Sequence, residues 1–260
     1  MGDDKTDRNR LRAVASTGTA FGTWCTLPCA PITEQLALTG PDYLTIDCQH
    51  GLIDYPDMVA MLQAMARTGV TALVRVPGHD VGTIGKALDA GAEGVIVPMV
   101  NDGVQAAHVA SACRYAPTGV RSYGPVRADA TVGSTDTSVL DAHVLCLVMI
   151  ETERGVEHAD EICATPGVDG VYIGPADLAI SLGERPGGLI PGRHTEAVEH
   201  VLDRCRAHAI IPGIHAYDGA TARRYAEMGF RMVTTGVDLR LLRATVADQL
   251  RDARATSTSP

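Results

Sequence analysis

Lysine is scarce in this sequence, since only Lys5 and Lys86 occur among its 260 residues. A mechanism that forms an imine on a lysine amine could therefore use only these two positions. Aromatic residues make up 4% of the chain, so a core must be built from Val, Ile, Leu, Met and Ala. No apolar run approaches the roughly 20 residues of a membrane-spanning helix. The N-terminal stretch MGDDKTDRNR carries no apolar secretion signal. We therefore expect a cytoplasmic protein without a membrane partner.

Other common signatures are also absent. The seven cysteines form no CxxC pair, which argues against a zinc knuckle and against a disulfide framework. Neither GxGxxG nor GxxxxGK[ST] occurs, which disfavours an open doubly wound sheet that binds a nucleotide. Acidic residues outnumber basic ones by 31 to 22, giving a net charge of −9. We expect neither a nucleic-acid partner nor an organic cofactor.

Short runs rich in Val, Ile and Leu alternate with longer amphipathic stretches along most of the chain. This alternation indicates buried parallel strands connected by helices. We predict strands at residues 19–26, 43–47, 71–76, 94–98, 144–150, 169–173, 209–214 and 230–235. We predict helices at residues 31–40, 55–67, 81–90, 102–114, 154–164, 194–208, 219–228 and 238–252. Eight such units in 260 residues match the roughly 250 residues of an α/β fold of the (β/α)8 TIM barrel type.

No linker or change in composition divides the chain, so we predict one barrel domain over residues 18–252. A polar segment, residues 1–17, precedes it, and a disordered tail, residues 253–260, follows it. Residues 116–142 and 183–193 are long for simple connections, and we expect them to shape the active site. Arg121 and Arg127 lie in the first of these segments. They would either bind an anionic substrate or form salt bridges between subunits.

Polar side chains stand at the carboxyl ends of four predicted strands. Asp47 and His50 follow the second strand, Arg75 ends the third, Glu151 follows the fifth, and Asp177 comes after the sixth. Active sites of (β/α)8 barrels form at this rim, so these side chains are expected to share one site. Each has a structural alternative, such as a helix cap for Asp177 or a salt bridge for Glu151. Their coincidence at one rim favours the functional interpretation.

These residue types suit one kind of chemistry. Two carboxylates, Glu151 and Asp177, offer hard oxygen ligands for Mg²⁺ or Mn²⁺. Such an ion could chelate a 2-oxo acid and stabilise an enolate. The guanidinium of Arg75 suits the carboxylate of that substrate. His50 could act as the acid/base, with Asp47 fixing its tautomer.

At these residues the sequence resembles the HpcH/HpaI family of metal-dependent pyruvate aldolases. The resemblance covers about residues 18–245. It is carried by FGTW, LTIDCQHG, LVRVPG, ALDAGAEGVIVPMV, CRYAPTGVRSYG, MIETERGVEHADEI and VDGVYIGPADLAISLG. The stretch IGPADL is the most specific of these.

The resemblance implies that Glu151 and Asp177 bind a divalent metal ion, which could be Mg²⁺, Mn²⁺ or Co²⁺. It also implies that Arg75 contacts the pyruvyl group and that Asp47 and His50 form an acid/base dyad.

Further implications concern the substrate carboxylate and the neighbouring subunits. The backbone of Gly174, Pro175 and Ala176 is expected to lie against the substrate carboxylate, and Asp89 to reach the site of a neighbouring subunit. Family members are typically hexamers that exchange their C-terminal helices, so we expect residues 238–252 to pack on another subunit.

Two positions depart from the family pattern. Gln49 stands where many relatives have Glu, which removes one negative charge near the site. Gln49 can still hydrogen-bond water on the metal or substrate. Met149 stands where relatives often have Gln, which changes the pocket for the second substrate.

The resemblance implies reversible cleavage of a 4-hydroxy-2-oxo acid into pyruvate, or a close 2-oxo acid, and an aldehyde. Lys5 lies in the polar N-terminal segment and Lys86 in a helix outside the barrel, so a metal must replace the imine. One alternative is a lyase that acts on acyl-CoA, like the citrate lyase β-subunit and malyl-CoA lyases. Another is a barrel that binds 2-oxo acids without catalysis. The sequence leaves the aldehyde, the preferred metal and the stereochemistry open.

Overall fold

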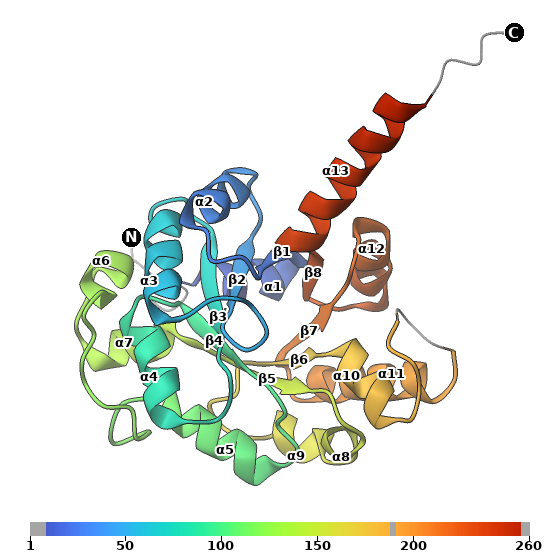
Figure 1. Ribbon diagram of the computed structural model, residues 1–260. Helices are drawn as coiled ribbons and strands as arrows, with labels where there is room; N and C mark the ends of the chain where they lie inside the picture. The colour runs from blue at the N-terminus through green and yellow to red at the C-terminus, as the bar shows by residue number, and fades with distance from the viewer. Residues whose placement is uncertain (1–8, 188–190, 256–260) are drawn as a thin grey trace, which may run out of the picture.

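The computed structural model describes residues 9–187 and 191–255, which form a closed barrel of parallel strands (Figure 1). The strands are β1 (Ala20–Cys25), β2 (Tyr43–Asp47), β3 (Thr71–Arg75), β4 (Gly94–Val97), β5 (Leu145–Ile150), β6 (Gly170–Ile173), β7 (Ile211–His215) and β8 (Met232–Val237). Each strand pairs with the next in the chain, and β1 pairs with β8 to close the ring. The eight predicted strands and the (β/α)8 fold are confirmed.

Helices connect the strands, and most of them surround the barrel on its outer face (Figure 1). They are α1 (Arg10–Thr17), α2 (Ala30–Leu38), α3 (Tyr55–Met65), α4 (Val81–Asp89), α5 (Gly103–Ala112), α6 (Ala128–Val132), α7 (Thr137–His143), α8 (Glu153–Glu157), α9 (Ala159–Cys163), α10 (Pro175–Ser181), α11 (Arg193–Ala207), α12 (Gly219–Met228) and α13 (Asp238–Arg254). The eight predicted helices are present, the one at 154–164 being divided into α8 and α9. Aspartates start several of them: the side chains of Asp80, Asp102 and Asp218 each accept a backbone N–H of the first turn.

The two-residue period of the strands decides which side chains enter the barrel. In β5, Cys146, Val148 and Ile150 pack outward against the helices. Leu145, Leu147 and Met149 point into the barrel. The same alternation carries Glu151, just beyond β5, to the inner side at the carboxyl end.

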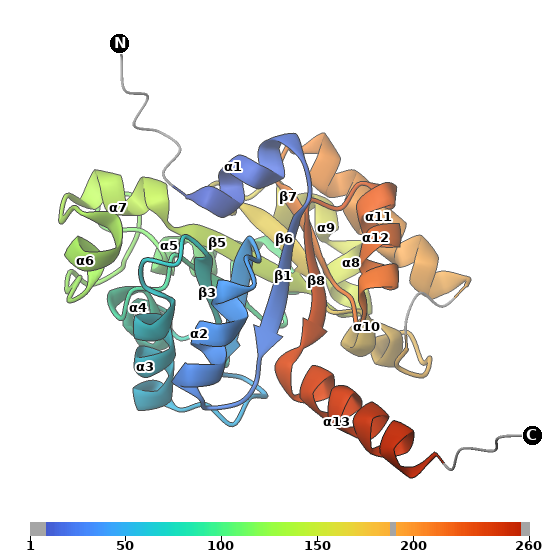
Figure 2. The ribbon, with the colours of Figure 1, turned by 90° about the horizontal axis from the view of Figure 1, so that it is seen from above.

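Helix α1 closes the amino-terminal end of the barrel, away from the arrowheads of the strands (Figure 2). Leu11 on this helix is fully buried among the inward-pointing side chains, and its backbone N–H donates to Thr71 Oγ1 at 3.2 Å. The Asn9 side chain caps the helix. The sequence alone predicted only a polar segment here. Residues 1–8, which include Lys5, lie outside the described residues.

The prediction that residues 116–142 shape the active site of their own barrel is wrong. These residues connect α5 to β5, so they lie at the amino-terminal end of the strands. Ala130 in this segment lines a groove with Val70 and Thr71, where β3 begins. Each helix in this fold runs antiparallel to its strand, from the carboxyl end of the barrel back to the amino-terminal end. A connection that follows a helix and leads into the next strand therefore lies at the amino-terminal end.

Helix α13 projects from the carboxyl-terminal side of the barrel into open space (Figures 1 and 2). Asp238 anchors its start, since the carboxylate accepts the backbone N–H groups of Thr26 and Leu27 at 2.9 and 3.0 Å. The helix reaches Arg254, so the first part of the tail predicted to be disordered is helical. Residues 256–260 lie outside the described residues. Within the part of the chain that the structure describes, no helix could cross a membrane.

Candidate active site

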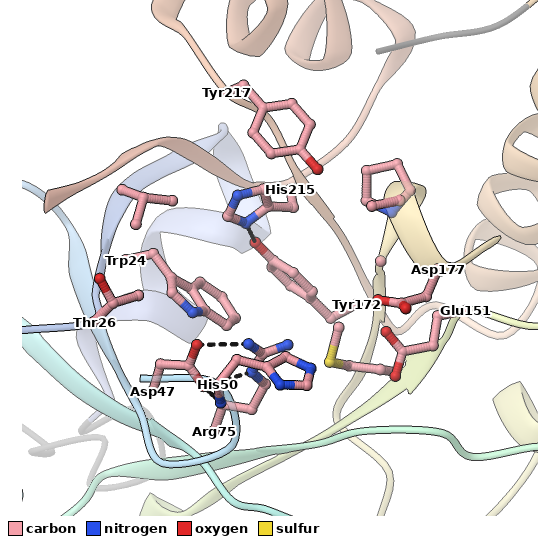
Figure 3. Close-up of a pocket in the computed structure, with 15 residues that line it drawn as sticks. Trp24, Thr26, Asp47, His50, Arg75, Glu151, Tyr172, Asp177, His215 and Tyr217 are labelled. Atoms are coloured by element: carbon pink, nitrogen blue, oxygen red, sulfur yellow. Dashed lines mark hydrogen bonds and ion pairs between the residues drawn. The ribbon is translucent and has the colours of Figure 1, made fainter. Parts of the chain in front are cut away.

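A pocket of about 200 Å³ opens at the carboxyl end of the barrel (Figure 3). It is lined by Trp24, Thr26, Asp47, His50, Arg75, Met149, Glu151, Tyr172, Gly174, Pro175, Ala176, Asp177, His215, Tyr217 and Val237. The five side chains that the sequence placed at this rim therefore come together in one cavity. Their contacts divide it into an ionic side and an aromatic side.

Arg75 and Asp47 form a buried ion pair on the ionic side. Arg75 Nε and Nη2 donate to the two Asp47 oxygens at 2.9 and 2.6 Å. Burial opposes the ionisation of Asp47, but the hydrogen bonds and charge of Arg75 outweigh it and lower the pKa of this carboxyl. The Arg75 guanidinium also lies over the Trp24 ring, 5.0 Å from its centroid. Arg75 Nη1 has no hydrogen bond in the described part of the chain, so it can bind a substrate anion.

Within the described structure Asp47 makes no hydrogen bond to the ring of His50, contrary to the prediction from the sequence. Besides the bonds from Arg75, Asp47 Oδ1 accepts the backbone N–H groups of Gln49 and His50 at 3.0 and 3.1 Å. The His50 ring is exposed at the pocket and makes no hydrogen bond within residues 9–187 and 191–255. Asp47 thus orients the turn that carries His50, rather than its imidazole.

Glu151 and Asp177 face each other across the adjoining part of the pocket (Figure 3). Glu151 is 2% exposed, and its Oε1 accepts the Met99 backbone N–H at 2.8 Å. Burial, followed by the nearby charge of Asp177, raises the pKa of Glu151 to about 7. Asp177 is exposed and stands in the first turn of α10.

This pair fits a divalent metal ion. The charge of Asp177 raises the pKa of Glu151 because two carboxylates repel each other, and a cation between them would remove that repulsion. Carboxylate oxygens are the ligands that Mg²⁺ and Mn²⁺ prefer. No cluster of three or more His, Cys, Asp or Glu side chains with metal-binding geometry occurs among the described residues. The remaining positions around an ion would therefore be left to water and substrate oxygens.

The segment Gly174–Ala176 lines the pocket beside Glu151 and Asp177. That its backbone lies against the substrate carboxylate stays a prediction from the resemblance. His194, a residue of α11, hydrogen-bonds the backbone of this segment. His194 is fully buried, and its Nε2 bonds to the carbonyl oxygen of Pro175 at 2.9 Å. The carbonyl can only accept, so Nε2 carries the proton.

The aromatic side of the pocket was not predicted from the sequence. The sequence alone did not single out Trp24, Tyr172, His215 or Tyr217 as site residues. All four line the cavity. The predicted seventh strand ended at residue 214, one residue short of the observed end of β7 at His215. Extending the alternation of Ile211 and Gly213 by one step would have placed His215 inside the barrel.

Gln49 and Met149 occupy different surroundings. Met149 is 2% exposed and lines the pocket, so it contributes to its shape. Gln49 is not among the lining residues, and its side-chain oxygen is buried without a hydrogen-bond partner in the described structure.

Asp89, Arg121 and Lys86 lie away from the pocket of their own chain. Arg121 Nη2 donates to Asp89 Oδ1 at 2.7 Å, and the Arg121 side chain is buried. Lys86 Nζ lies over the Tyr55 ring, 4.9 Å from its centroid, on the outer side of the barrel. An imine on Lys86 could not reach the substrate pocket.

Comparisons with known proteins identify the family of the chain. The HpcH/HpaI aldolase/citrate lyase family matches residues 20–245. A hydroxypyruvate/pyruvate aldolase of Rhizorhabdus wittichii is 39% identical over 95% of this chain and 99% of its own. A 5-keto-4-deoxy-D-glucarate aldolase of Klebsiella pneumoniae is 33% identical over 93% of this chain and 94% of its own.

Among solved structures, a HpcH/HpaI aldolase/citrate lyase family protein of Burkholderia cenocepacia superimposes with a TM-score of 0.88 and 31% identity. That match covers 95% of this chain and all (100%) of the other.

Proposed function

Because the chain belongs to the HpcH/HpaI aldolase/citrate lyase family, we propose that it is a class II aldolase that depends on a divalent metal. It reversibly cleaves a 4-hydroxy-2-oxo acid into pyruvate, or a close 2-oxo acid, and an aldehyde. The observation that carries the proposal is the meeting of Arg75, His50 and the Glu151–Asp177 pair in one pocket. Relatives named hydroxypyruvate/pyruvate aldolases support pyruvate or hydroxypyruvate as the 2-oxo acid.

A cation such as Mg²⁺, Mn²⁺ or Co²⁺ held by Glu151 and Asp177 would supply the charge that stabilises the enolate of the 2-oxo acid. The protein's own groups bind and orient the substrate around that position. Arg75 offers Nη1 to the substrate, while Asp47 and the Trp24 ring hold the guanidinium in place. The backbone of Gly174, Pro175 and Ala176 lies against the substrate carboxylate.

His50 moves the proton. Its exposed ring accepts the proton of the 4-hydroxyl group as the bond between C3 and C4 breaks. The electron pair of that bond becomes the enolate, and the aldehyde leaves. A proton returned to C3 completes pyruvate. In the synthetic direction the enolate attacks an aldehyde.

The proposed assembly is a homo-oligomer, with the hexamer as the expected form. Helix α13 exposes an apolar stripe formed by Leu239, Leu242, Val246 and Leu250. Four large apolar side chains at helical spacing on a projecting helix favour burial against another subunit. In such an assembly Asp89 would contribute to a neighbouring site. A cytoplasmic location stays a prediction from the sequence.

Deuterium exchange of pyruvate in D₂O tests the proposal without an aldehyde. We expect the methyl proton signal to disappear with Mn²⁺ and to persist with EDTA. Glu151→Ala and Asp177→Ala should each lose metal binding, measured by calorimetry, together with exchange. Glu227→Ala, on the exposed face of α12, is the matched control and should retain both.

The same experiment has a pH dependence. Glu151 stays protonated up to a pKa of about 7, so metal affinity should rise with pH toward neutrality and then level off. Exchange that continues in EDTA, or at the full rate in Glu151→Ala, would contradict the proposed function.

A further inference from the structure

A line of hydroxyl groups crosses the barrel interior beneath the aromatic side of the pocket. Tyr43 Oη lies 3.1 Å from Thr234 Oγ1, and Tyr172 Oη lies 2.5 Å from the same oxygen. Tyr172 Oη also lies 3.4 Å from His215 Nδ1. The four residues come from β2, β8, β6 and β7, and the first three are fully buried. The contact at the end of this line orients Nδ1 of the His215 ring toward the barrel interior.

Aromatic neighbours fix the plane of the His215 ring. Its centroid lies 5.3 Å from the Trp24 ring and 5.1 Å from the Tyr217 ring, both in edge-on geometry. Figure 3 shows the ring between these two side chains, above the Tyr172 hydroxyl. Because Nδ1 faces Tyr172, Nε2 is the nitrogen left for a ligand. Within residues 9–187 and 191–255 it makes no hydrogen bond, and His215 lines the pocket.

The surroundings keep this imidazole neutral. Burial, followed by the positive charges of Arg75 and Arg240, lowers the pKa of His215 to about 4, and the negative charge of Asp47 offsets only part of this. A neutral ring offers one nitrogen that donates and one that accepts. His50, by contrast, is exposed on the ionic side. The two histidines of the pocket therefore differ in chemistry.

We propose that His215 is a specificity-determining residue that hydrogen-bonds a hydroxyl group of the substrate, so that the enzyme prefers hydroxylated substrates to alkyl substrates of equal size. This inference rests on the proposed aldolase function. A hydroxyl can both donate and accept, so it pairs with Nε2 in either tautomer of the ring. A methyl group in the same place leaves Nε2 desolvated and unpaired, which costs binding energy.

Two pairs of substrates of matched size identify which substrate carries the hydroxyl. With pyruvate as donor, kcat/KM is compared for glycolaldehyde and propanal. Without an aldehyde, exchange of the C3 protons in D₂O is compared for hydroxypyruvate and 2-oxobutanoate. In each pair a hydroxyl replaces a methyl group, and the selectivity is the ratio of the two rates on one variant. A loss of activity that affects both substrates equally therefore leaves this ratio unchanged.

His215→Leu should lower the hydroxyl-to-methyl ratio about ten-fold in one of the two pairs, since one neutral hydrogen bond is lost. Tyr172→Phe keeps the aromatic surface but removes the hydroxyl at Nδ1. It should lower the same ratio by a smaller factor and change the tautomer balance of His215, which ¹⁵N NMR measures. His108→Leu, on α5 outside the pocket, is the matched control and should change neither ratio.

A direct measurement on the unchanged protein covers the case in which His215→Leu fails to fold. The ¹⁵N signal of His215 Nε2 should shift when the hydroxylated substrate binds and stay in place with its alkyl counterpart. Unchanged ratios in both pairs, or an unshifted Nε2 signal, would overturn the inference. If pyruvate itself shows no metal-dependent exchange in the wild-type protein, it is the aldolase function that fails.

Discussion

At the scale of single residues, Asp47 matters because of the groups that it binds and orients. It neutralises Arg75 inside the barrel and accepts two backbone N–H groups of the turn that leads to His50. A carboxylate with these partners stays ionised, which its lowered pKa reflects. Asp47 is therefore best described as a positioning residue for Arg75, the arginine proposed to bind the substrate.

This role predicts how Asp47→Asn behaves. Arg75 loses the charge that orients its guanidinium, so the KM for pyruvate should rise at least ten-fold, as expected for a broken buried ion pair. The pH dependence of kcat should keep its midpoint, because the His50 ring is not bonded to Asp47. Steady-state kinetics across pH measures both quantities.

Asp54→Asn is the matched control for this variant, since Asp54 is an exposed helix cap on α3 and Asn caps equally well. A shifted pH profile with an unchanged KM would instead indicate that Asp47 acts on the His50 ring.

At the scale of elements, the strands position the site by alternation, and glycines make room for large inward-pointing side chains. Tyr172 fills the interior between β6 and β7 because Gly213 has no side chain there. A Cβ added at Gly213 would lie 2.7 Å from the Tyr172 ring. Gly22 in β1 has the same relation to Tyr43, with a Cβ distance of 2.5 Å. The hydroxyl line beneath the pocket thus depends on two glycines.

Substitution of Gly213 by Ala should lower the free energy of unfolding by about 1–3 kcal/mol, because Tyr172 must move within a packed interior. Gly85→Ala is the matched control. Gly85 lies within α4 and a Cβ there meets no atom within 4 Å. It should stabilise the protein by about 0.5–1 kcal/mol through higher helix propensity. Urea unfolding of both variants measures the difference, and equal stabilities would show that the interior relaxes freely around Tyr172.

At the scale of the whole molecule, the two ends of the barrel differ in how they are covered. Helix α1 covers the amino-terminal end, whereas α13 projects from the carboxyl-terminal side (Figure 2). The apolar stripe of α13 is exposed. Asp238 ties the start of α13 to the loop after β1, so its direction is set by the barrel. This exposed stripe supports the proposal that a second subunit covers it.

Val246→Glu should shift the protein to a smaller species in sedimentation velocity, because a charge in the apolar stripe opposes its burial. Ala244→Glu introduces the same side chain on the opposite side of α13 and serves as the control. It should leave the sedimentation coefficient unchanged. If both variants sediment like the wild type, the stripe is not part of a subunit interface.

Much of the fold could be predicted because it follows from local patterns. Alternating apolar runs and amphipathic stretches located the eight strands, and the strand ends brought Arg75, Glu151 and Asp177 to one rim. The error over residues 116–142 arose because segment length alone does not say at which end of the barrel a connection lies. Residues 1–17 were predicted to be a polar segment, but Leu11 within them is buried inside the barrel.

By itself, the sequence determined that this protein is a barrel with a carboxylate pair, an arginine and a histidine at one mouth, without a lysine able to form an imine there. Residue types and their spacing along strands are enough for that. Only the tertiary structure decided that Asp47 holds Arg75 rather than the His50 ring, and that His215 faces the pocket with a neutral nitrogen. Those facts depend on which side chains from distant strands meet inside the barrel. Burial and the positions of hydrogen-bond partners there decide which groups are hydrogen-bonded and which are charged.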